Sequence, residues 1–384
     1  MLPPSRSELT QRFSLQFCQT FMSAELAGKE VRYVQEDVST CGYIRDCCTG
    51  TETVIIMGSL VVACRGSLVA MEQAAKDSHV DIVGPLLGGG SQIEQGPSIP
   101  FAYHDTASFR EASDWVLMES GSQVRRVEEL APDIFCCPGR FFTALPAELP
   151  LKQLSRHPIW AKAPKGVVEG SLAHTFSAYY SHARADLAAL VPQDALLILD
   201  VGCGSGGLGS QLKAVRSSVR IVGVEPDPEA AAKAEFTYDQ VHIGTVASYQ
   251  ADSMFDCIVC GDVLEHLEDP WRALSKFHAL LKNEGYLVGS CPNVGHWTVL
   301  KGLLEGHFQY LPAGILCWDH LRHFTEDSLL HMLKGSGFQE VEVRAEKALP
   351  TPKGEAFLDV LQKAGLGSRP MLLTSGFIFT ARKI

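Results

Sequence analysis

The segment Leu196–Glu225, LLILDVGCGSGGLGSQLKAVRSSVRIVGVE, governs the interpretation of the whole chain. It begins with a short apolar run that ends at Asp200, and a glycine-rich turn follows directly. A helical pattern covers Leu208–Val215, and a second apolar run, Ile221–Val224, ends in a glutamate. This order of strand, glycine turn, helix, strand and acid predicts a βαβ unit with parallel strands.

The residue types around the turn indicate a nucleotide-binding site. Glycine allows a sharp backbone turn and lets a ligand approach without a side chain in the way. The carboxylate of Glu225, at the end of the second strand, can accept hydrogen bonds from both hydroxyls of a ribose. The GxGxG spacing matches the dinucleotide pattern only loosely, so a plain tight turn in an α/β sheet is the alternative.

Two stretches together resemble class I S-adenosylmethionine-dependent methyltransferases. DVGCGSGGLG, at 200–209, resembles the first motif of that family, and FDCIVCGDVLEHLEDPWRAL, at 255–274, resembles its fourth strand and the helix after it. The resemblance covers roughly residues 170–384. It implies an α/β fold with a Rossmann-like seven-stranded sheet, helices on both faces and an antiparallel last strand. It also implies S-adenosyl-L-methionine as the cofactor.

The resemblance places the cofactor at the carboxyl ends of the strands, where ligands of such sheets bind. A helix expected over Ser171–Leu190 would cap the pocket, with packing of its tyrosines as the alternative. Thr245 stands where many relatives carry an acid that holds the adenine amino group, and its hydroxyl can do part of that task. The expected cofactor-binding residues are Tyr180, Asp200, Gly202, Gly204, Gly206, Glu225, Thr245, Asp262, Val263 and Leu264.

The insert CPNVGHWTVLKGLLEGHFQYLPAGILCWDHLRHFT, at 291–325, carries the candidate acceptor site. It resembles the PN-x-x-HW, GIL and HLR-x-FT pattern of methyltransferase domains that accompany glycosyltransferases in polysaccharide gene clusters. Cys317 replaces the aspartate that this subfamily usually has after GIL. Aromatic and polar side chains suit a sugar or another small polar acceptor. The expected substrate-binding residues are Trp297, Tyr310, Trp318, Asp319, Arg322 and His323, and pinning of the loop is the alternative for each.

A direct methyl transfer to a hydroxyl needs a group that draws off the hydroxyl proton. Histidine is the side chain with a suitable pKa near neutral pH. The candidates for this base are His296 and His320, with His266 third. His320 and His323 also form an HxxH pair, but no third ligand has a clear spacing, and no metal site is expected.

The cysteines predict buried thiols in a reducing compartment. The chain has twelve cysteines, no apolar run that could span a bilayer, and no signal-peptide core in MLPPSRSELTQRF. We therefore expect a cytoplasmic protein. Cys257 and Cys260 form a CxxC within a strand, where residues three apart point to opposite faces and cannot share a metal. Adjacent pairs at Cys47–Cys48 and Cys136–Cys137 have poor geometry for zinc.

The N-terminal third resembles the later half of a family 2, GT-A-type glycosyltransferase domain. Strand-like runs at 53–56 and 80–87, a helical pattern at 68–76 and a unit at 131–145 follow the order of that fold. The family places metal-binding acids after the first of these strands, but this chain has MGSL at 57–60. Nucleotide-diphosphate metals need carboxylate oxygens, so we expect a degenerate, glycosyltransferase-like remnant.

The length of 384 residues favours two domains. We expect a degenerate glycosyltransferase-like α/β domain over 1–150, a proline-containing linker over 151–170 and a methyltransferase domain over 171–384. The net charge of −11 argues against a nucleic-acid partner. The acceptor is expected to be a small molecule or saccharide, and a homo-oligomer is compatible with the sequence. Two other functions stay open: a glycosyltransferase or bifunctional enzyme, and a non-catalytic scaffold with a methyltransferase fold.

Overall fold

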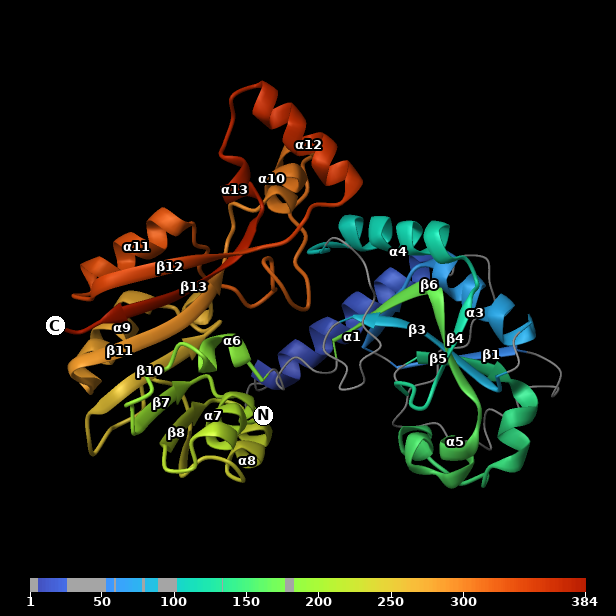
Figure 1. Cartoon of the computed structure of the whole chain (residues 1–384), viewed down its shortest axis with the longest axis horizontal. Coiled ribbons are helices and arrows are strands. Elements are labelled where there is room, and N and C mark those ends of the chain that lie inside the picture. Colours follow the sequence, from blue (N-terminus) through green and yellow to red (C-terminus); the bar gives the residue numbers. More distant parts are fainter. Residues whose placement is uncertain are drawn as a thin grey trace. The chain divides into compact units, whose positions relative to one another are not determined.

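The computed structural model describes residues 6–25, 53–58, 60–77, 80–88, 102–132, 134–176 and 183–384. The chain divides into two compact units, Gln11–Tyr179 and a unit that contains Tyr180–Ile384 (Figure 1). Each unit has its own sheet and its own hydrophobic core. No described helix combines the length and the apolar character that crossing a membrane requires.

The N-terminal unit is built on a six-stranded mixed sheet with the order β1-β5-β3-β6-β2, and β4 also pairs with β6. The longest strand, β6, pairs in parallel with β3 and antiparallel with β2 and β4. The elements of this unit are α1 (Arg6–Glu25), β1 (Thr53–Met57), β2 (Val61–Ala63), α3 (Arg65–Asp77), β3 (Ile82–Gly88), α4 (Thr106–Ser120), β4 (Val124–Val127), β5 (Ile134–Pro138), η1 (Gly139–Ala144), η2 (Leu151–Arg156), α5 (Pro158–Lys162) and β6 (Lys165–Thr175).

The expected linker over 151–170 and the helix over 171–190 are wrong. Residues 165–175 form β6, an almost fully buried strand of the N-terminal sheet. The two prolines mark element ends: Pro158 is the first residue of α5, and Pro164 directly precedes β6. A proline fixes φ and removes one N–H, so it suits such boundaries as well as a linker. Among the described residues of the expected helix, 171–176 and 183–190, Ala185–Ala188 are helical, as α6.

The C-terminal unit has a seven-stranded sheet with the order β12-β13-β11-β10-β7-β8-β9. Strands β7 to β11 pair in parallel, and β13 runs antiparallel to both neighbours. The elements are α6, β7 (Leu197–Val201), α7 (Gly207–Val215), β8 (Arg220–Glu225), α8 (Pro228–Ala234), β9 (Gln240–Ile243), β10 (Phe255–Gly261), η3 (Leu264–His266), α9 (Pro270–Leu280), β11 (Leu281–Pro292), α10 (Trp297–Leu304), α11 (Glu326–Gly335), β12 (Gln339–Lys347), α12 (Pro352–Lys363), α13 (Arg369–Leu372) and β13 (Thr374–Arg382).

Alternation along the central strands separates the two faces of this sheet. Cys257 and Val259 of β10 pack with α6, α7 and α8, whereas Ile258 and Cys260 pack with α9 and α11. Both faces are therefore covered, as a parallel sheet requires, and Figure 1 shows helices on either side. The CxxC cysteines are buried and belong to opposite faces, as the two-residue period of a strand predicts.

Candidate active site

The glycine loop after β7 has the backbone conformation that its sequence indicates. Gly202, Gly204 and Gly206 have φ values of +73°, +52° and +90°, a region that favours glycine because it has no Cβ. A Cβ at Gly202 would also lie 2.7 Å from Val263 Cγ2. The loop then leads into α7.

Glu225 ties this loop to the end of β8. Its side chain is buried, Oε2 accepts the Gly204 N–H at 2.9 Å, and Oε1 accepts the Asp227 N–H at 2.9 Å. The carboxylate thus fixes the turn through two backbone N–H groups. A nucleoside fits this arrangement, because a buried acid and a turn without side chains lie at the carboxyl ends of adjacent parallel strands.

Asp200, at the end of β7, is held by a residue that the sequence analysis missed. Tyr238 donates its hydroxyl hydrogen to Asp200 Oδ2 at 2.5 Å and accepts the Gly209 N–H at 3.1 Å. Burial raises the pKa of Asp200 to about 7, the bond from Tyr238 lowers it, and the negative charge of Glu225 raises it. Tyr238 lies 38 residues from Asp200 and carries no local sequence signal for this contact.

Replacing Asp200 by asparagine is expected to flatten the pH dependence of stability. A carboxyl group with a pKa of about 7 when folded and 3.8 when unfolded binds protons better in the folded state. Its stabilising contribution is complete below the unfolded value and is lost as the pH rises to about 7. Urea unfolding at pH 5 and pH 8 should show a smaller fall in the free energy of unfolding for Asp200→Asn. An equal fall in both proteins would contradict this.

The carboxyl ends of β10 and β11 carry a second charged group. Asp262 forms an ion pair with Arg184 and accepts a hydrogen bond from Ser290 Oγ at 2.8 Å. Arg184 also donates to Ser290 Oγ at 2.9 Å and pairs with Asp186 at 2.8 Å. Arg184 and Asp262 both have positive φ, at 45° and 53°, so the fold holds two strained residues in one contact. The sequence analysis did not assign Arg184 or Ser290 to the site.

Other expected cofactor residues have mixed outcomes. Val263 and Leu264 follow β10 directly and are buried. The Val263 side chain lies beside the glycine loop, close to Gly202. Thr245 is exposed after β9, and its carbonyl accepts the Ser248 hydroxyl. Tyr180 lies outside the described residues.

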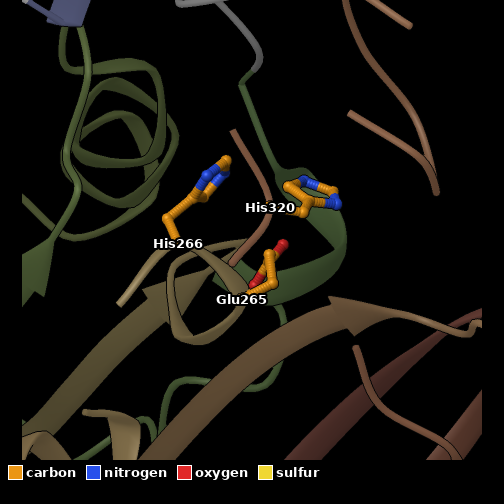
Figure 2. A group of neighbouring side chains, drawn as sticks. All are labelled: Glu265, His266 and His320. Carbon is orange, nitrogen blue, oxygen red and sulfur yellow. The ribbon is translucent and has the colours of Figure 1, made fainter. Parts of the chain in front are cut away.

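Three side chains gather where η3 follows β10. Glu265 and His266 come from η3 and His320 from the insert, and one possible ligand atom of each lies within 4.8 Å of the others (Figure 2). The backbone explains this proximity, because the N–H groups of Leu321 and Arg322 both donate to the Glu265 carbonyl, at 2.8 and 2.9 Å. The insert is therefore joined directly to η3.

The two histidine rings of this cluster are oriented by their Nδ1 atoms. His320 Nδ1 lies 3.0 Å from the Ile315 carbonyl oxygen, and His266 Nδ1 lies 3.2 Å from the Asp319 carbonyl oxygen. The rings meet edge to face, with centroids 4.7 Å apart. Burial, together with the neighbouring His266, lowers the pKa of His320 to about 4.

Glu265 is the unusual member of the cluster. Its side chain is fully buried, and neither carboxylate oxygen has a hydrogen-bond partner. Burial raises the pKa of Glu265 well above its ordinary value, and the charge of Asp262 adds to the effect. Native proteins rarely leave a buried polar group unsatisfied, so this carboxylate calls for a functional explanation.

His296 has a different environment. It is buried and caps the N-terminus of α10, with Nδ1 2.9 Å from Thr298 Oγ1 and 3.4 Å from the Thr298 nitrogen. Such a capping role stabilises the helix.

The expected substrate residues divide into three groups. Trp297 is buried with Leu358 and Leu372 in a small separate core. Tyr310 and His323 are exposed and contact Phe308 edge to face. Trp318, Asp319 and Arg322 are half-buried; Asp319 accepts from Cys317 Sγ at 3.1 Å, and Arg322 donates to the Glu268 carbonyl.

The C-terminal part of the chain is similar to known methyltransferases. Residues 172–343 match the family described as "Methyltransferase domain". Two relatives, both ubiquinone biosynthesis O-methyltransferases, come from Cereibacter sphaeroides (28% identical, 41% of this chain and 66% of that protein) and Ruegeria pomeroyi (31%, 41% and 65%). The matches span less than two thirds of the length of these two relatives.

Among solved structures, an S-adenosylmethionine-dependent methyltransferase from Archaeoglobus fulgidus aligns with 54% of this chain and 98% of its own, at 17% identity and a TM-score of 0.41. The family model and the two sequence relatives make the C-terminal unit similar to methyltransferases. The matched region contains both the glycine loop and the Glu265–His266–His320 cluster.

Proposed function

We propose that this chain is an S-adenosylmethionine-dependent methyltransferase that methylates a hydroxyl group of a small molecule, such as a sugar. The observation that carries the proposal is the buried Glu225 carboxylate that holds the glycine loop open at the carboxyl ends of β7 and β8. Neither the buried acid nor the open loop is needed for a scaffold alone. The O-methyltransferase names of the two relatives support an oxygen acceptor.

Residues of the glycine loop and Glu225 would hold the nucleoside part of the cofactor, and Asp200 would lie beneath the loop. When bound, S-adenosylmethionine supplies a methyl group on a positively charged sulfur, which an acceptor oxygen can take while the C–S electron pair returns to sulfur. The chain must then position the hydroxyl and remove its proton.

The Glu265–His266–His320 cluster is the best place for proton removal. Glu265 and His266 follow the end of β10, just after Asp262 and Val263. Val263 lies beside Gly202 of the glycine loop. The imidazoles of the cluster are oriented by carbonyl oxygens, whereas His296 is engaged as a helix cap. We therefore rank His266 and His320 above His296. Among the exposed polar residues nearby, Tyr310 and His323 are the proposed acceptor contacts.

The subfamily, the saccharide acceptor, the glycosyltransferase-like origin of the N-terminal unit and the cytoplasmic location stay predictions. One observation bears on the N-terminal unit: the described residues at the end of β1 and just after it, 57, 58 and 60, carry no carboxylate. The lack of carboxylates at these positions favours a structural role for that unit over nucleotide-sugar chemistry.

The proposed function is tested with the full chain by calorimetry and by methyl transfer. We expect S-adenosylmethionine to bind at micromolar concentration, and labelled methyl groups to pass to hydroxyl acceptors from a panel of sugars and phenols. A nucleotide-sugar, tested in parallel, should not bind. Binding of the nucleotide-sugar without binding of S-adenosylmethionine would favour the glycosyltransferase alternative. Binding of neither would favour the scaffold.

A further inference from the structure

The unsatisfied Glu265 carboxylate is the starting point for a second site. A charged carboxylate is costly to bury unless it is paired, hydrogen-bonded or bound to a metal. Glu265 has no hydrogen-bond partner for either oxygen, yet two imidazoles lie beside it (Figure 2). A bound cation would compensate this charge more fully than the charge of Arg184, which acts on Glu265 only weakly beside the burial.

The hydrogen bonds of the two histidines fit metal binding. A carbonyl oxygen can only accept, so His266 and His320 must each donate from Nδ1 to Asp319 and Ile315. A neutral imidazole protonated at Nδ1 has its lone pair on Nε2. Ligating histidines commonly show this pattern, in which the second ring nitrogen donates to a carbonyl or carboxylate and fixes the ring. Asp319 adds a carboxylate oxygen 3.4 Å from His266 Nδ1.

We propose that Glu265, His266 and His320 bind one divalent transition-metal cation of the Zn²⁺ class. Their ligand atoms lie within 4.8 Å of one another, and small side-chain rotations would bring them to the roughly 3.3–3.6 Å that tetrahedral bonds of about 2.0–2.2 Å to one ion require. Two nitrogen donors and one oxygen donor favour Zn²⁺ or a similar first-row ion over Mg²⁺, which prefers oxygen ligands. Three protein ligands also leave a coordination position open.

A second set, Cys317, Asp319 and His320, has the same spacing but is less suitable. Cys317 Sγ donates to Asp319 Oδ1 at 3.1 Å and to the Pro312 carbonyl at 3.3 Å, so the thiol and the acid already satisfy each other. The set that contains Glu265 is therefore the site, and Asp319 acts as a positioning residue for His266.

The open coordination position suggests what the cation does, and this part rests on the proposed function. An acceptor hydroxyl bound to the ion would lose its proton to solvent more easily, because a Lewis acid lowers the pKa of a bound hydroxyl. The resulting oxygen is the nucleophile that methyl transfer needs. The cluster would then bind the acceptor as well as activate it.

The metal site is tested without cofactor or acceptor, on the full chain after treatment with a chelator. Co²⁺ is titrated into the protein, and its visible absorption reports a site with protein ligands. We expect one ion per chain, displaced by Zn²⁺ but not by an equal concentration of Mg²⁺. Zn²⁺ should also raise the midpoint of thermal unfolding. No Co²⁺ absorption in the wild type, or displacement by Mg²⁺ in preference to Zn²⁺, would overturn the proposal.

Variants identify the ligands. Glu265→Gln keeps the shape of the side chain and resembles the neutral acid of the metal-free protein. It cannot supply the anionic oxygen that the metal would bind. Zn²⁺ affinity should therefore fall by more than the ~10–100-fold typical of outer-shell changes. In Asp319→Asn, the loss of Zn²⁺ affinity should stay within ~10–100-fold, because Asp319 acts through His266. His331→Ala, an exposed histidine on α11, and Cys317→Ser should bind Co²⁺ as the wild type does. Retained affinity in Glu265→Gln would show that Glu265 is a structural acid instead.

Two further measurements keep the outcome interpretable. If Glu265→Gln does not fold, His320→Gln removes a ligand from the insert without changing the buried carboxylate. Calorimetry with S-adenosylmethionine on the same samples separates the two proposals. Cofactor binding without metal binding would refute the metal site alone, whereas metal binding without cofactor binding would refute the proposed function alone.

Discussion

His320→Ala is expected to lower kcat by about 10²–10⁴, the usual contribution of proton removal by a positioned group. S-adenosylmethionine affinity should stay unchanged, because His320 belongs to the insert and not to the glycine loop. A loss is expected whether the imidazole accepts the proton itself or holds a cation that lowers the pKa of the bound hydroxyl. Single-turnover methyl transfer with saturating cofactor measures it.

Two matched histidine variants sharpen this test. His331→Ala removes an exposed ring on α11 and should leave kcat at the wild-type value. His296→Ala should mainly lower the free energy of unfolding, by about 0.5–2 kcal/mol, because it removes the cap of α10. A fully active His320→Ala enzyme would mean that positioning alone carries the catalysis. A folded but inactive His296→Ala enzyme would reverse the ranking of the two residues.

Glu225→Gln is expected to weaken S-adenosylmethionine binding by about 10- to 150-fold. Both carboxylate oxygens accept backbone N–H groups, from Gly204 and Asp227, whereas glutamine offers one oxygen. The NH₂ group of glutamine would face one of these two N–H donors, so the loop loses one hydrogen bond. A bound ligand also loses a charged acceptor. Hydrogen bonds to charged groups contribute about 1.5–3 kcal/mol, which gives the expected range.

Calorimetry on the variant and on a matched control measures this effect. Glu229→Gln changes an exposed glutamate in the first turn of α8 and should bind the cofactor as the wild type does. Thermal unfolding shows whether the Glu225 variant keeps its fold. Unchanged affinity in a folded Glu225→Gln protein would remove Glu225 from the cofactor site.

The sequence by itself determined the C-terminal fold and half of the candidate cofactor site. Short apolar runs, a glycine loop and a terminal acid are local patterns, because strand, turn and helix formation depend on neighbouring residues. Hence Gly202, Gly204, Gly206 and Glu225 lie where the pattern predicts them. The separation of Cys257 and Cys260 follows from the same two-residue period of a strand.

Tertiary structure alone decided the contacts between distant segments. Tyr238 reaches Asp200, Arg184 reaches Asp262, and His320 reaches Glu265 across 38, 78 and 55 residues. No periodicity encodes such pairs, since they depend on how loops return to one edge of the sheet. The same cause explains the error at 165–175: a buried central strand and a helix can share one apolar pattern, and only the pairing of β6 with β3 decides between them.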